Sequence, residues 1–167
     1  MKFFSANIED LRTLYKDELQ KALDMEQKIV KALPTMVEKS TDPDLASAFR
    51  AHLEQTRGHV TKVEGMLFKN TGEASTTACK VISSLVSSAE DSIKDAKDAN
   101  IRDVSLIAAA QQVEHHEMAI YGTLRTWAGI LGERDDAATL ESILKEEEKA
   151  DQLLTQIAGH VNIQAAA

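Results

Sequence analysis

Long stretches without helix-breaking residues are the feature that most constrains this fold. The chain has 167 residues with 7 Gly and 2 Pro, and its uninterrupted segments are rich in Ala, Leu, Glu, Lys and Gln, which favour helices. Apolar residues recur at spacings of three and four, whereas a buried strand would show strict alternation. Aromatic residues, which favour strands, make up only 4%. The sequence therefore predicts an all-α protein.

Breakers and caps divide the chain into four long helices and one short one. The first is expected from a cap at Asn7 to about residue 39, with Pro34 kinking it or ending it early. The second starts at Asp42-Pro43 and reaches about residue 68. A shorter helix over 81–100 lies in the long connection, and long helices follow over about 100–130 and 136–161.

This order predicts a ferritin-like antiparallel four-helix bundle with a long crossover that carries a shorter fifth helix. A length of 167 residues suits one domain spanning 1–167. The competing layout is a long coiled-coil assembly, but the short turns near residues 41 and 133 favour antiparallel hairpins.

Charge and cysteine content exclude several classes of function. The 27 acidic and 19 basic residues give a net charge of -8 without a basic patch, so we expect no nucleic-acid or membrane-surface partner. The single Cys79 cannot form an internal disulfide, and no apolar run approaches the ~20 residues of a membrane span. Acidic residues begin by Glu9, too early for a signal peptide. A cytoplasmic location is expected.

Acidic residues interrupt the apolar stripes of three predicted helices. Glu114 and Glu117 fall within a seven-residue seam on the helix over 100–130, and Glu147 and Asp151 do the same on the last helix. Glu26 lies on the apolar face of the first helix. An antiparallel register places Glu26 opposite the turn 54–59, and Glu114 and Glu117 opposite the turn 147–151. These carboxylates are therefore expected to meet at the middle of the bundle.

The second helix offers a weaker candidate. Glu54 lies at the edge of its stripe, which we assign as Leu45, Phe49, Leu53, Thr56, Val60, Val63 and Leu67. Arg57, one turn away, could instead pair with Glu54 and leave a smaller site. His59 lies off the face of Glu54 and His52 lacks a matching partner, so both are interpreted as surface or packing residues. His115 and His116 point away from Glu114, so at least one of them should face outward or into a subunit contact.

Buried carboxylates that lie close together need protons or cations to neutralise them. Two bound metal ions would supply the cations, and oxygen-rich ligation favours iron first, with manganese as the alternative. No phosphate-binding loop, serine nucleophile motif or paired cysteine ligands occur in the sequence. The alternative is a helical scaffold whose acids are protonated or paired with Lys and Arg.

Four segments resemble the YciF-like ferritin-like family. They are LDMEQKIVKALP (23–34), AHLEQTRGH (51–59), LIAAAQQVEHHE (106–117) and LKEEEKAD (144–151). The resemblance implies a ferritin-like bundle, a homodimer, a di-metal carboxylate site and an association with bacterial stress. It supports six metal-site candidates: Glu26, Glu54, Glu114, Glu117, Glu147 and Asp151.

The chain departs from rubrerythrin-like sites at two places. Arg57 stands where some relatives have His, and Ala150 and Asp151 stand where such sites would place His. A strict rubrerythrin-type centre is therefore not expected. The leading hypothesis is a dimeric di-iron protein acting on oxygen or peroxide, and the rival is a structural or interaction homodimer. Iron storage of the ferritin kind is a third option, which requires a closed cage.

Overall fold

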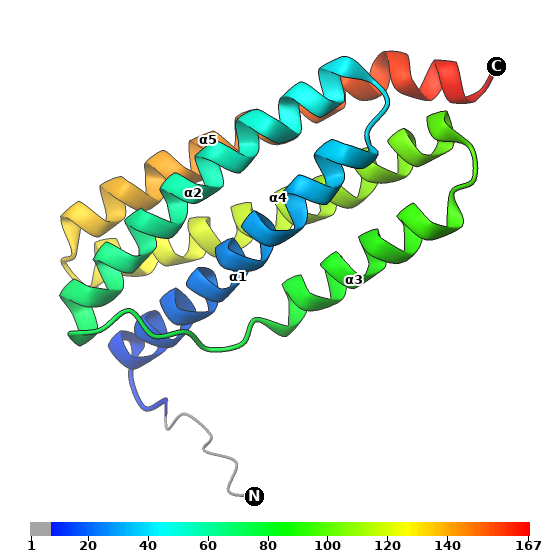
Figure 1. The fold of residues 1–167 in the computed structure, drawn as a ribbon. Helices are drawn as coiled ribbons and strands as arrows, with labels where there is room; N and C mark the ends of the chain where they lie inside the picture. Colours follow the sequence, from blue (N-terminus) through cyan, green and yellow to red (C-terminus); the bar gives the residue numbers. More distant parts are fainter. Residues whose placement is uncertain (1–7) are drawn as a thin grey trace, which may run out of the picture.

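The computed structural model describes residues 8–167, which form five α-helices and, within this range, no strand. These are α1 (Leu11–Lys39), α2 (Pro43–Thr71), α3 (Lys80–Asp95), α4 (Ala99–Ile130) and α5 (Arg134–Ala165), shown in Figure 1. The all-α prediction is confirmed. The predicted cap Asn7 lies outside the described residues, and α1 instead begins after Asp10, whose side chain accepts a hydrogen bond from the Thr13 N–H at 2.7 Å.

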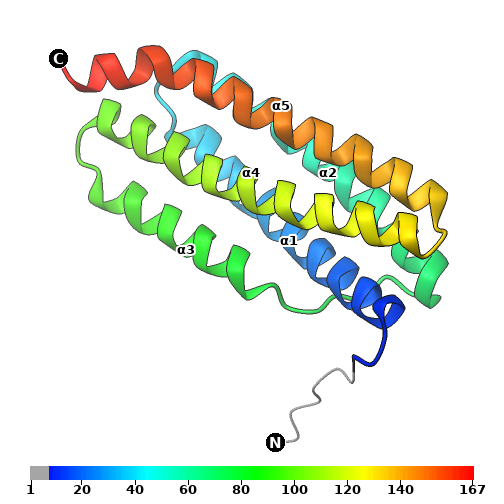
Figure 2. The ribbon, with the colours of Figure 1, turned by 180° about the vertical axis from the view of Figure 1, so that it is seen from behind.

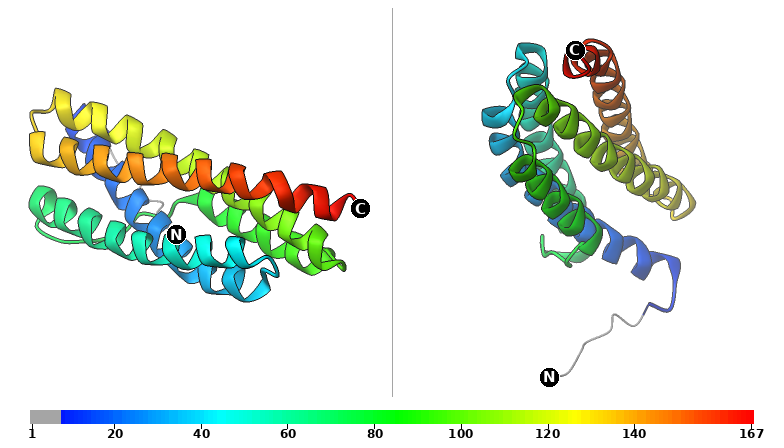
Figure 3. Two further views of the ribbon diagram at one scale, coloured as in Figure 1. Left: turned by 90° about the horizontal axis from the view of Figure 1, so that it is seen from above. Right: turned by 90° about the vertical axis from the view of Figure 1, so that its right-hand side faces the viewer.

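The long helices pair as two antiparallel hairpins. α1 packs along α2, α4 packs along α5, and contacts between α1 and α4 and between α2 and α5 join the hairpins. The long connection carries α3, which lies against α4 and α1 on one side of the bundle (Figure 2). The view from above in Figure 3 shows α4 and α5 side by side along most of their lengths. The predicted ferritin-like bundle with a helical crossover is thus confirmed.

Pro34 does not end α1, which continues five residues further to Lys39. Proline cannot donate its backbone N–H, so one helical hydrogen bond is lost. Pro34 lies on the exposed face of α1, where the carbonyl left without a partner can be hydrated. The expected end near residue 39 is therefore confirmed, and of the two effects considered for Pro34, a kink or an early end, the early end does not occur.

The turns at the two ends of the bundle are held by local chemistry. Asp42 caps α2 by accepting hydrogen bonds from the Asp44 and Leu45 N–H groups at 3.0 Å, and Pro43 follows it in the first turn. Gly132, between α4 and α5, has a φ of 79°, a conformation that costs little only for glycine. These turns fix the antiparallel register within each hairpin.

The apolar core runs the length of the bundle and is interrupted near its middle. Buried side chains such as Leu19, Leu67 and Leu140 lie toward the α4–α5 turn, and others such as Phe49 and Leu106 lie toward the α1–α2 turn. Between them the same inward faces carry polar groups. Across residues 8–167, no helix combines the length and the apolar character needed to cross a membrane.

Candidate metal centre

Four of the predicted carboxylates meet at the middle of the bundle. Glu26 comes from α1, Glu114 and Glu117 come from α4, and Glu147 comes from α5; none is more than 3% exposed. Glu114 and Glu117 share a helix face because they are three residues apart. The predicted convergence of these carboxylates is therefore present in the structure.

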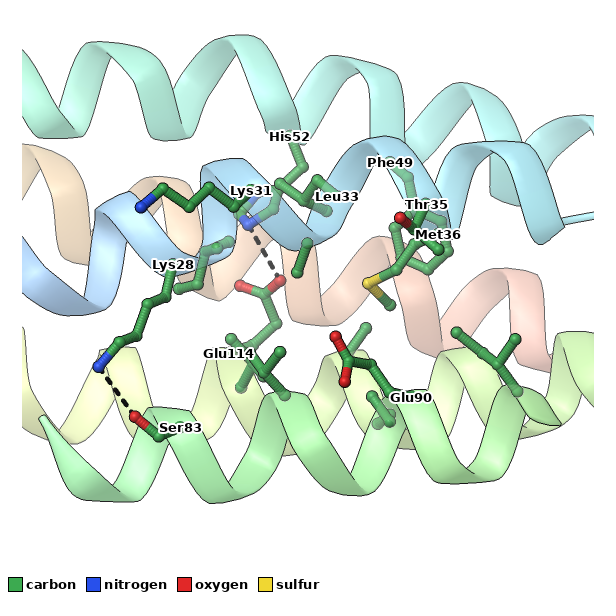
Figure 4. Close-up of a pocket in the computed structure, with 18 residues that line it drawn as sticks. Lys28, Lys31, Leu33, Thr35, Met36, Phe49, His52, Ser83, Glu90 and Glu114 are labelled. Atoms are coloured by element: carbon green, nitrogen blue, oxygen red, sulfur yellow. Dashed lines mark hydrogen bonds and ion pairs between the residues drawn. The ribbon is translucent and has the colours of Figure 1, made fainter. Parts of the chain in front are cut away.

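Two histidines from α2 complete the cluster. His59 Nδ1 lies 2.9 Å from Glu147 Oε1 and 3.6 Å from Glu26 Oε1. His52 Nε2 lies 3.3 Å from Glu114 Oε1 and 3.9 Å from Glu147 Oε2, and Figure 4 shows the first of these pairs. Both histidines are buried. Our interpretation of His52 and His59 as surface or packing residues is wrong, since they face the carboxylates.

The cluster divides into two overlapping groups of ligand atoms. His52, Glu114, Glu117 and Glu147 each place one such atom within 4.8 Å of those of the other three, and Glu26, His59 and Glu147 do the same. Glu147 belongs to both groups. A carboxylate has two oxygens, so Glu147 could contribute one oxygen to each group.

The structure does not bring Glu54 into the cluster. Its side chain is 69% exposed and forms an ion pair with Arg57, one turn away on α2. The expectation that Glu54 faces inward is therefore wrong, because its position turns it toward solvent. The pairing with Arg57 that we considered as the alternative is the one observed.

Asp151 lies at the border of the cluster. Its side chain is 19% exposed, accepts a hydrogen bond from Gln111 Nε2 at 3.2 Å, and lies 3.4 Å from His115 Nε2. These partners hold Asp151 toward the outer side of α4, and it belongs to neither ligand group. His115 is exposed, as expected, and His116 lies near Cys79 on another side of α4.

The hydrogen-bonding state of the cluster provides a test of whether metal ions fit. In the described part of the chain, nine buried side-chain nitrogen and oxygen atoms lack a hydrogen-bond partner, and all nine belong to Glu26, His52, His59, Glu114, Glu117 and Glu147. His59 and Glu147 are close enough for an ion pair but lack hydrogen-bond geometry. Buried polar atoms without partners are costly. Four carboxylates and two imidazoles form a donor set suited to a pair of iron or manganese ions.

Burial also sets the charge of the cluster in the metal-free protein. Burial and repulsion from Glu147 raise the pKa of Glu114 and of Glu117 well above its usual value. Burial, opposed by the charge of His59, raises the pKa of Glu26 to about 8. Burial opposes protonation of His59, but Glu147 and Glu26 outweigh it and raise its pKa to about 9. Without metal, protons thus take the place of cations.

Neighbouring side chains orient the candidate ligands. His59 Nε2 lies 2.7 Å from Glu146 Oε2, and Lys62 Nζ donates to Glu146 Oε1 at 3.2 Å. With a metal ion bound, a proton on Nε2 directed at Glu146 would leave the Nδ1 lone pair free to face the ion, an arrangement common for metal-bound histidine. The buried Tyr121 hydroxyl donates to Glu26. These contacts orient the ring of His59 and the carboxyl group of Glu26.

A different choice of stripe on α2 would have revealed the histidines. Seven residues spaced by three and four along α2 are all buried: Leu45, Phe49, His52, Thr56, His59, Val63 and Met66. Our assigned stripe drifted one position from this seam at residues 53, 60 and 67. The signal was the presence of two histidines seven residues apart, which places both on one face of a helix.

The fold and the buried cluster together define a ferritin-like helical bundle whose carboxylates and histidines fit a di-metal centre. One solved structure, described as ferritin-like, diiron-carboxylate proteins from Bacillus anthracis str. Ames, has a TM-score of 0.70 with 15% identity, covering 89% of this chain and 98% of that one. At this level of identity, the likeness supports the fold alone.

Closer relatives identify the family. Residues 10–167 match the model of a domain of unknown function, DUF892. The chain is 32% identical over 153 residues to protein YciF of Escherichia coli (strain K12), covering 91% of this chain and 92% of that protein. The structure of that stress protein superposes with a TM-score of 0.87, and YcfI from Rhodopseudomonas palustris superposes with 0.88 at 35% identity, covering 92% of this chain and 98% of that one. The chain therefore belongs to the DUF892 family of YciF-like proteins.

Proposed function

We propose that this protein is a di-iron carboxylate protein that handles iron or reacts with oxygen or peroxide under stress. The observation that carries the proposal is the set of buried atoms without hydrogen-bond partners, all of them in one cluster that separates into two groups sharing Glu147. The description of the YciF relative as a stress protein supports the physiological part of the proposal.

The ligand groups assign a role to each residue of the cluster. His52, Glu114 and Glu117 would hold one ion, Glu26 and His59 would hold the other, and Glu147 would serve both. Two iron ions would supply the electrons needed to reduce oxygen or peroxide. The buried apolar layers on both sides of the cluster keep bulk water away from it.

His59 and Glu146 connect the buried cluster to the surface. Glu146 is 29% exposed and is also bound by Lys62, so His59 contacts a carboxylate at the surface of the bundle. Through its contact with Glu146, His59 would hold its ring so that Nδ1 faces the ion. Tyr121 keeps its own proton, because burial and the charge of Glu26 raise its pKa well above the usual value.

Anaerobic titration with Fe(II) tests the proposal. Protein stripped with a chelator should bind two Fe(II) ions per chain, and exposure to oxygen or peroxide should then produce the absorption of an oxo-bridged di-ferric centre. Glu117→Ala should lower the iron content, since it removes a ligand of one group. Failure to bind iron stoichiometrically would contradict the proposal.

A structural or interaction role is the second candidate. It is favoured by the raised pKa values of Glu114 and Glu117, which allow these carboxyls to be buried as neutral acids without metal. In that case the purified protein would remain folded and iron-free after exposure to Fe(II). The titration therefore separates the two candidates.

We also propose that the protein acts in the cytoplasm as a homodimer. Light scattering should then give twice the chain mass of 18.3 kDa. A cage-sized particle would instead favour iron storage, which needs a closed shell of subunits.

A further inference from the structure

A mostly apolar cavity leads from the α3 side of the bundle to the candidate metal centre. It has a volume of about 370 Å³ and lies between α1, α3 and α4 (Figure 4). Its walls include Ile29, Leu33 and Met36 of α1, Val86 and Ile93 of α3, and Val113 of α4. The helix in the crossover thus encloses space next to the four-helix bundle.

The inner end of this cavity is formed by two residues of the cluster. His52 and Glu114 both line it, both are more than nine-tenths buried, and both carry side-chain atoms without hydrogen-bond partners. A molecule in the cavity would therefore touch the His52–Glu114 edge of the centre. Glu26 and His59 do not line this cavity.

The mouth of the cavity does not select a charged molecule. Lys28 is already engaged, because its amine binds Asp24 and donates to Ser83 Oγ at 2.8 Å. Lys31 and Glu90, the other charged residues of the rim, are exposed and opposite in sign. Mixed charge at the mouth and apolar walls favour a neutral occupant, since burying a charge without a partner is costly.

We propose that this cavity binds a neutral, apolar organic molecule whose inner end lies against His52 and Glu114. An apolar cavity of ~150 Å³ holds benzene, so the present cavity suits a molecule of roughly two to three times that size, such as a two- or three-ring aromatic compound or a medium-length aliphatic chain. This inference rests on the proposed function in one respect, because it assumes that the bound molecule would lie beside the two metal ions.

A second cavity reaches the cluster from the side of α2 and α5. This cavity of about 140 Å³ also reaches His52 and Glu114, and its lining includes Gln55, Glu146 and Lys149. Filling the larger cavity should therefore leave metal loading intact. Binding of the organic molecule can be measured in metal-free protein, so the two proposals can fail independently.

The test uses N-phenyl-1-naphthylamine, a neutral probe that fluoresces in apolar surroundings. Metal-free protein should bind one probe per chain. Ala109→Leu and Ala89→Leu place larger side chains in the cavity from α4 and α3 and should weaken probe binding by about tenfold or more. Ala108→Leu and Ser88→Leu change exposed neighbours that do not line the cavity, and binding should stay within about twofold of the unmodified protein.

Circular dichroism establishes whether each variant is folded. If Ala109→Leu does not fold, probe binding by Ala89→Leu alone provides the test. Competition then defines the ligand class: decanol should displace the probe at lower concentration than decanoate or decylamine. Absence of saturable binding, equal binding by folded cavity-filling and control variants, or a preference for either charged competitor would overturn the proposal. Two bound Fe(II) ions in Ala109→Leu would show that the cavity variant leaves metal loading unchanged.

Discussion

Buried carboxylates occur both at the middle and near the ends of this bundle, but their surroundings differ. Near the α4–α5 turn, Asp136 accepts hydrogen bonds from Tyr15 Oη at 3.1 Å, Lys69 Nζ at 3.0 Å and Asn70 Nδ2 at 2.8 Å. At the other end, Asp103 accepts from the N–H groups of Thr41 and Asp42 at 2.9 and 2.8 Å. The central carboxylates instead retain atoms without partners.

The difference separates a structural acid from a candidate ligand. Asp136 and Asp103 are as deeply buried as Glu114, so burial alone does not identify a metal site. Their donors satisfy the charge and join elements that are distant in sequence. At the centre, the carboxylates face mostly other hydrogen-bond acceptors instead of donors, and bound cations would neutralise their charge. The predictions below test this contrast between the centre and the ends.

The largest effect on iron binding is expected for Glu147→Gln. Glu147 is common to both ligand groups, so the variant should weaken binding of both iron ions by about 100-fold or more. Metal analysis after anaerobic loading measures the loss. Glu148→Gln is the matched control, since Glu148 is exposed on the same helix. Equal iron in both variants would remove Glu147 from the centre.

Asp136→Ala should lower the stability of the fold without changing iron binding. It leaves the buried Tyr15 hydroxyl and Asn70 amide without their acceptor, which should lower the free energy of unfolding by about 2–4 kcal/mol. Iron binding should be unchanged. Urea denaturation of metal-free protein provides the measurement, with Asp135→Ala as the exposed neighbour for comparison. Loss of iron in folded Asp136→Ala would break the distinction between centre and ends.

The stability of the metal-free protein should fall as the pH rises. Protonated Glu26 stabilises the fold fully below pH 4.5, and this contribution is lost as the pH rises through its raised pKa of about 8. Protonated His59 likewise stabilises the fold fully below pH 6.5, and this contribution is lost as the pH rises through its raised pKa of about 9. The Tm should therefore drop by roughly 10 °C or more between pH 5.5 and pH 8.5.

Metal should remove this dependence, because bound ions replace the protons of the cluster. Thermal scans with and without Fe(II) under anaerobic conditions provide the comparison. Glu26→Gln should reduce the slope in metal-free protein, since its amide does not titrate. A Tm that is independent of pH, or a slope unaffected by Fe(II), would count against the charge assignment.

Glu54→Gln should have the smallest effect. Glu54 is exposed and paired only on the surface with Arg57, so the free energy of unfolding should stay within about 0.5 kcal/mol of the unmodified protein. Iron binding should remain at the unmodified level. Reduced iron content would show that Glu54 reaches the centre in solution.

Much of the fold could be predicted from the sequence because long amphipathic helices are local features. Turn signals such as Asp42-Pro43 placed the hairpins, and the hairpin register correctly put Glu26 opposite the turn that contains His59. Core acids at Glu114, Glu117 and Glu147 stood out because they interrupt strong apolar seams. The same local logic allowed either a kink or an early end at Pro34, and tertiary packing keeps α1 intact to Lys39.

The errors at the centre have a single physical origin on α2. Its weaker periodicity allowed two stripes that differ by one position, and the choice between them decided whether His52 and His59 or Glu54 faced inward. Only packing against α1 and α5 selects the correct face. Asp151 illustrates a different limit, since its position at the border depends on Gln111 and His115 of α4.

The most direct test of the central claim is anomalous diffraction at the iron absorption edge from crystals grown anaerobically with Fe(II). We predict two peaks roughly 3.5–4 Å apart, one beside His52, Glu114 and Glu117, and the other beside Glu26 and His59, with Glu147 contacting both. An absence of peaks within the cluster, or iron bound only at surface acids while the buried carboxylates remain protonated, would contradict the account.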